Sequence, residues 1–72
     1  MSMSARRLQL TVTGIAPEGY YGSITVLDTV DDESGHEYGI ACEPRMAHDI
    51  EAALKAGEPV TIEAEAWQIV YG

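Results

Sequence analysis

Residues 37–66 read EYGIACEPRMAHDIEAALKAGEPVTIEAEA, and this stretch decides the fold class. Its central part is typical of a helix, because Pro44 suits the first turn and Gly57 fits the left-handed cap beyond the last turn. Pro59 prevents any continuation, so we predict a helix over about residues 44–56. The apolar stripe of this helix is predicted to consist of Met46, Ile50, Ala53 and Leu54, which recur at helical spacing.

Both flanks of this helix alternate apolar and polar residues, as half-buried strands do. The alternation predicts one strand over residues 37–43 and a final strand over residues 60–66, the latter with an apolar inner side and an acidic outer side. Upstream, alternation and β-branched content predict strands over residues 8–13 and 23–27. The apolar residues change parity at Trp67, so we expect a bulge or a sharp bend there.

These elements define an α+β fold with the order β-β-β-α-β. One helix should pack on a sheet that is either a small antiparallel sheet or a partly open barrel. The length of 72 residues predicts a single domain over residues 1–72, with residues 1–5 expected to be flexible. Cys42 is the only cysteine, so the core has no internal disulfide and must hold by packing.

The charge of the chain is strongly negative, with 12 acidic residues against 4 Lys and Arg and a net charge of -8. Such a charge repels nucleic acid and anionic membranes and attracts basic protein surfaces. We therefore expect a basic nucleic-acid-binding protein or complex as the partner, without direct binding to nucleic acid or membrane. Six of the acids lie in a stretch without Lys or Arg: Asp28, Asp31, Asp32, Glu33, Glu37 and Glu43.

Two arrangements could present these acids. Residues 31–35 form a polar, glycine-containing run, which predicts an exposed hairpin loop with dense negative charge. Glu63 and Glu65 lie two residues apart on one side of the last predicted strand, about 6.6–6.8 Å from each other, and form a second patch. Rigidly spaced carboxylates could compete with DNA for a basic groove, whereas the alternative is that all these acids are a solvated coat.

The residues that carry chemistry in enzymes and metal sites are poorly arranged here. His36, Cys42 and His48 are six residues apart, which matches no standard zinc motif, and Cys42 falls on the buried side of its strand. No glycine-rich phosphate loop is present. We expect no enzymatic activity, no catalytic residues, no metal and no cofactor. No run of about 20 apolar residues occurs either, and we expect a cytoplasmic protein.

The segments 37–40, 54–58 and 63–66, with the acids at 31–33, resemble the C-terminal half of small phage-encoded anti-CRISPR proteins. These proteins inhibit type I, particularly type I-F, systems, and the resemblance covers about residues 20–66. It implies a protein that binds the Cascade surveillance complex at its DNA-recognition site and mimics the phosphates of the target. It also implies action in the cytoplasm of an infected bacterial host.

Two functions therefore remain open. As an inhibitor, the protein would contact its target through the six clustered acids and through Glu63 and Glu65, with Tyr20 and Tyr21 as additional contact area. As a structural or adaptor module, it would bind a larger assembly through its sheet edge or through an apolar patch of Trp67, Ile69 and Tyr71. Either a monomer or a homodimer is compatible with the sequence.

Overall fold

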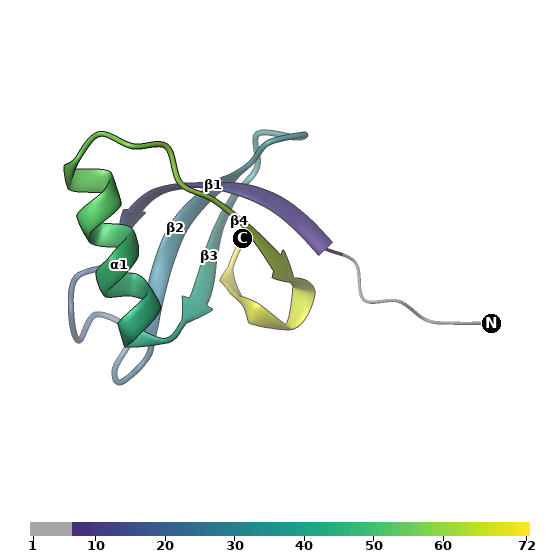
Figure 1. The fold of residues 1–72 in the computed structure, drawn as a ribbon. Helices are drawn as coiled ribbons and strands as arrows, with labels where there is room; N and C mark the ends of the chain where they lie inside the picture. The colour runs from purple at the N-terminus through teal and green to yellow at the C-terminus, as the bar shows by residue number, and fades with distance from the viewer. Residues whose placement is uncertain (1–6) are drawn as a thin grey trace.

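The computed structural model describes residues 7–72, so the expected flexibility of residues 1–5 lies outside the described part. Within it, the first four strands and the α-helix follow the order predicted from the sequence and confirm the α+β fold, and a fifth strand comes after them (Figure 1). The elements are β1 (Arg7–Ile15), β2 (Thr25–Asp31), β3 (Glu37–Cys42), α1 (Pro44–Lys55), β4 (Thr61–Glu65), the 3-10 helix η1 (Ala66–Gln68) and β5 (Ile69–Tyr71).

The strands form one open antiparallel sheet with the order β4-β1-β2-β3-β5. β4 and β5 stand at opposite edges of this sheet although only the three residues of η1 separate them in sequence. The sheet must therefore curl until its two edges come near each other. The curl creates a concave inner face, which holds the core, and a convex outer face.

The bend expected at Trp67 is confirmed and takes the form of η1. The backbone N–H of Glu65 donates a hydrogen bond to the side-chain oxygen of Gln68 at 2.9 Å, which completes a capping box. After this turn the chain crosses to the other edge of the sheet, where Ile69 pairs with Ile40. The separate short strand β5 was not predicted.

Most of the buried apolar residues form two clusters on the inner face of the sheet. The first lies inside the curl and comprises Leu8, Leu10, Ile40 and Ala64. The second lies against α1 and comprises Val12, Leu27, Ala47 and Ile50. The helix therefore covers one end of the curled sheet, as the ribbon shows (Figure 1).

The predicted helical stripe is wrong at Met46, whose side chain is 53% exposed. Ala47 takes its place on the inner side, while the predicted Ile50 is buried and the predicted Leu54 packs against the same cluster. These three residues follow steps of 3 and 4, so the predicted inner side holds from Ile50 onward and differs only in the first turn, where Ala47 replaces Met46. The cap is as predicted, because Gly57 has a φ of 77° just beyond the helix.

The second strand begins later and extends further than predicted. Ile24 is 52% exposed and precedes the strand, whereas pairing with β1 continues as far as Asp31. The extension buries Thr29, whose hydroxyl needs a hydrogen-bond partner away from water. The backbone oxygen of Tyr38 provides it, because it accepts a hydrogen bond from this hydroxyl at 2.9 Å. As a result Asp28 and Asp31 belong to a strand, and only the residues after Asp31 form the turn.

Candidate binding surface

The strand register places Glu63 and Glu65 together on the outer face of the sheet. On β1, Leu8 and Leu10 point into the core, so Arg7 and Gln9 point outward. Gln9 pairs with Glu63 and Arg7 pairs with Glu65, and directly paired residues share a face. The second patch predicted from the sequence is therefore present on β4.

Three further acids reach the same face from β2, β3 and the turn between them. Asp28 pairs with Gly14 on one side and with Gly39 on the other, and Glu37 lies in the next outward position of β3. Asp32 follows β2, and its carboxylate accepts a hydrogen bond from the outward-pointing hydroxyl of Thr11. We call the five residues the outer acidic face: Asp28, Asp32, Glu37, Glu63 and Glu65.

Asp31 and Glu33 lie at the turn between β2 and β3, at the border of this face. One carboxylate oxygen of Asp31 accepts the backbone N–H groups of Glu33 at 2.8 Å and Ser34 at 3.3 Å. The backbone N–H of Asp31 also donates a hydrogen bond to the backbone oxygen of His36, and the backbone oxygen of Asp31 accepts one from Gly35. Gly35 has a φ of 76°. The side chain of Asp31, which was predicted to contact a partner, therefore stabilises the turn. The side chain of Glu33 is exposed.

Glu43 lies apart from the other acids. It follows β3 at the end opposite the turn, six residues and about 20 Å from Glu37. There it occupies the N-cap position of α1, and its backbone oxygen accepts the N–H of Ala47 at 3.0 Å. The acids that are neighbours in sequence between positions 28 and 43 therefore do not form one patch.

Positive charge reaches the outer acidic face at a single described residue, Arg7. Its guanidinium lies 3.2 Å from the carboxylate of Glu63, and both side chains are more than half exposed. Hydrogen bonds from Gln9 and Arg7 lower the pKa of Glu63, so this carboxylate stays ionised. The other cations among residues 7–72, Arg45 and Lys55, lie on α1. Five carboxylates thus face one guanidinium.

Tyrosines cover the middle of the outer face. The hydroxyl of Tyr71 donates a hydrogen bond to Asp28, and its ring lies directly over Gly39 on the neighbouring strand. Tyr21 stacks on Tyr71 with ring centres 6.2 Å apart, and Tyr20 meets the edge of Tyr21 at 4.8 Å. The link between Tyr71 and Asp28 was not predicted, because it depends on which strands become neighbours.

The patch proposed at the C-terminus is divided by the curl of the sheet. Ile69 packs against the first core cluster, and Tyr71 joins the outer face. Trp67 alone is strongly exposed, at 76%, while its indole N–H donates a hydrogen bond to Glu65. The three residues therefore do not form a single apolar surface.

The bond between Tyr71 and Asp28 should be visible in a titration. The hydrogen bond to Asp28, with smaller contributions from burial and the nearby charges, raises the pKa of Tyr71 from 10.0 to about 12. The raised pKa means that Tyr71 keeps its proton to a higher pH in the folded state than in the unfolded state. Its contribution to the stability of the fold is therefore complete below about pH 10 and is lost as the pH rises toward 12.

We expect Asp28→Asn to lower the ionisation midpoint of Tyr71. The measurement is phenolate absorbance against pH, with the Tyr71 signal assigned by subtracting the curve of Tyr71→Phe. An unchanged midpoint in Asp28→Asn would show that the carboxylate does not hold the phenol.

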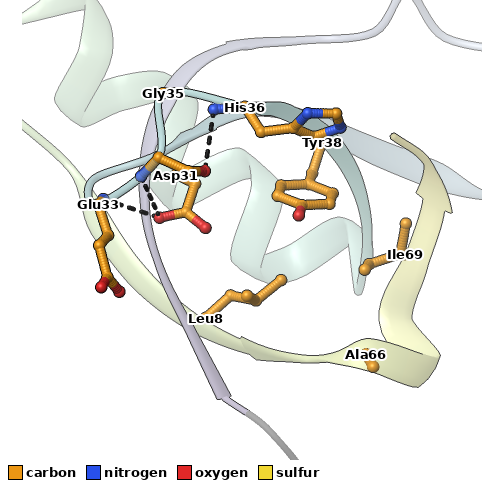
Figure 2. A pocket seen from close by; sticks show the side chains of 9 residues that line it. Leu8, Asp31, Glu33, Gly35, His36, Tyr38, Ala66 and Ile69 are labelled. Atoms are coloured by element: carbon orange, nitrogen blue, oxygen red, sulfur yellow. Dashed lines mark hydrogen bonds between the residues drawn. The ribbon is translucent and has the colours of Figure 1, made fainter.

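A hollow of about 840 Å³ opens between the turn after β2 and η1 (Figure 2). Leu8, Tyr38 and Ile69 form its apolar walls, and Asp31 and Glu33 lie at its rim. The ring of His36 leans on Tyr38 with ring centres 4.6 Å apart. The remaining lining residues are Ser34, Gly35, His36 and Ala66.

The residues weighed for zinc binding lie in different parts of the fold. His36 is beside the turn, His48 is on α1, and Cys42 packs against the second core cluster, where burial raises the pKa of its thiol. Within residues 7–72, no three potential metal ligands of the His, Cys, Asp and Glu types come together. The helix in this same range is too short and too polar to cross a membrane.

Comparison of the chain with protein-family models, with curated proteins and with solved structures gave no match.

Proposed function

We propose that this protein is a non-enzymatic inhibitor that binds a basic nucleic-acid-recognition site through the outer acidic face and the adjoining turn. The observation that carries the proposal is the gathering of five carboxylates against one guanidinium on one face of a paired sheet. Paired strands hold four of these charges at fixed spacings and the hydrogen bond from Thr11 holds Asp32, so they need little ordering when a partner binds. A basic groove that accepts phosphates would also accept them.

The target class comes from the sequence resemblance. It indicates a phage anti-CRISPR protein that acts on a type I Cas effector in the cytoplasm of the bacterial host, with carboxylates in place of DNA phosphates. The structure supports the charge mimicry by its arrangement of acids, and the identity of the effector is a proposal.

The first experiment is a pair of double charge reversals. Glu33→Lys with Glu37→Lys changes two exposed acids at the turn end of the surface, and among residues 7–72 neither side chain has a hydrogen bond or ion pair that the change would break. We expect the association rate with a purified type I Cascade complex to fall by about 10-fold or more. Folding should be preserved, as measured by circular dichroism.

The matched control is Glu18→Lys with Glu58→Lys, which changes the net charge equally at exposed positions away from the outer acidic face. This control should associate nearly as fast as the wild type. Raising the salt concentration from about 50 mM to about 500 mM should slow the wild type and remove most of the difference between variants. Equal effects of the two pairs, or salt-independent binding, would contradict the proposal.

A second candidate is an adaptor module that docks through Trp67. The specific observation is that this large apolar side chain is exposed and yet held in place by Glu65. In this case Trp67→Ala would weaken partner binding more than the Glu33 and Glu37 reversals do. The same rate measurements on the three variants distinguish the two functions.

A further inference from the structure

The two ends of the curled sheet differ in what covers them. The second core cluster is covered by α1, which contributes Ala47 and Ile50 to it. At the other end, Leu8 belongs to the first cluster, and Tyr38 and Ile69 pack against it, yet all three also line the hollow beside η1 (Figure 2). The apolar interior therefore ends in an open pocket, and an inserted side chain would extend the core there.

The rim of this pocket is acidic. Asp31 and Glu33 line it from the turn, and their charges stand next to the apolar walls. The turn hydrogen bonds hold the carboxylate of Asp31 in position before any partner arrives. Arg7 lies in the adjoining hollow, where its guanidinium is paired with Glu63. An apolar floor below carboxylates fits a side chain that is apolar along its stem and cationic at its end.

We propose that this pocket receives an arginine side chain of the basic partner. The methylene groups would lie against Leu8 and Ile69, and the guanidinium would lie against the ring of Tyr38 and face the carboxylates of the rim. Arginine fits better than lysine because its planar head stacks on aromatic rings and matches carboxylates through several donors. This inference takes the basic nature of the partner from the proposed function. It adds the type of partner residue that is bound and the place on this protein where it is bound.

The test uses the full chain and the tripeptide acetyl-Gly-Arg-Gly-amide, followed by NMR chemical shifts. We expect saturable shifts at Leu8, Tyr38 and Ile69, with a dissociation constant on the order of millimolar, as suits one side chain. The citrulline tripeptide keeps the shape of arginine without its charge, and it should produce no saturable shifts. The lysine tripeptide should bind more weakly than the arginine one.

A variant that fills the pocket provides the structural control. Ala66→Leu adds bulk at a lining position and leaves every acid in place, so it should abolish the saturable shifts. Ala52→Leu makes the same change at an exposed position of α1 and should leave them intact. The inference is overturned if the shifts instead map to the outer acidic face, if citrulline binds equally, or if Ala66→Leu binds as well as the wild type.

The outcome also separates this inference from the proposed function. Salt-dependent binding to Cascade without saturable arginine shifts at the pocket would remove the pocket alone. Saturable arginine binding at the pocket without any Cascade association would remove the proposed target and leave an arginine-binding pocket.

Discussion

Replacing Gly39 with alanine is expected to lower the free energy of unfolding by about 1–3 kcal/mol, the range typical of overpacking a well-packed site. A Cβ atom at this position would stand inside the van der Waals distance of three carbon atoms of the Tyr71 ring. The ring would have to leave its place over β3. It would thereby lose its hydrogen bond to Asp28 and weaken the pairing of β5.

The direction of this effect is opposite to the usual one. Glycine within a strand is normally less stable than alanine by roughly 0.5–1 kcal/mol, and Gly39 does not have a positive φ that would require glycine. Only the neighbouring ring makes alanine unfavourable. A bare glycine covered by an aromatic ring from the adjacent strand is a known way to pin strand register.

Urea unfolding followed by circular dichroism measures the change, and Gly14→Ala is the matched control. Gly14 also lies in a strand, and a Cβ atom there would meet Asp28 only at an ordinary distance of 3.8 Å. In a Tyr71→Val background, Gly39→Ala should become nearly neutral, because the ring that opposes it is gone. Equal stability of Gly39→Ala and Gly14→Ala in the wild-type background would contradict the packing described here.

The contact between Tyr71 and Gly39 involves β5, the strand that could not be predicted from the sequence. Strands of five residues or more, and the helix between its proline and its glycine cap, carry enough periodicity to be recognised. β5 has three residues, which is too short for alternation to identify a strand. Its pairing with β3 depends on the curl of the whole sheet, and no local pattern encodes that.

The acids illustrate the same limit. Glu63 and Glu65 were assigned to one face from their spacing, and their pairing with Gln9 and Arg7 confirms it. Sequence proximity failed for Glu43, because a whole strand separates it from Glu37. The roles of Asp31 could not be predicted either, since they depend on a turn that its own carboxylate stabilises. Parity along a strand thus placed both of its acids correctly, whereas density along the chain placed five of its six acids on or beside the outer acidic face and failed at Glu43.

Replacing Leu27 with alanine should have the largest effect on stability, about 2–5 kcal/mol. Leu27 is fully buried in the second core cluster, where β2 meets the helix. At about 0.05–0.15 kcal/mol per residue, a chain of 72 residues has a total stability of about 4–11 kcal/mol. The substitution would therefore remove a large share of the total, and a considerable fraction of the molecules could unfold.

Thermal unfolding of Leu27→Ala tests this, with Ile24→Ala as the control. Ile24 is also a branched aliphatic residue near β2, but it is 52% exposed, so its truncation should change the melting temperature only slightly.

The Leu27→Ala substitution also has a consequence for partner binding, which follows from the position of Leu27 in β2. Asp28 is the next residue along β2 and points to the opposite face, so Leu27→Ala leaves the carboxylates unchanged and alters only the scaffold that spaces them. If the rigid spacing of the acids matters, Leu27→Ala should weaken binding to a basic partner even though no charge is lost. Binding at wild-type affinity by an unfolded Leu27→Ala chain would instead mean that net charge alone is recognised.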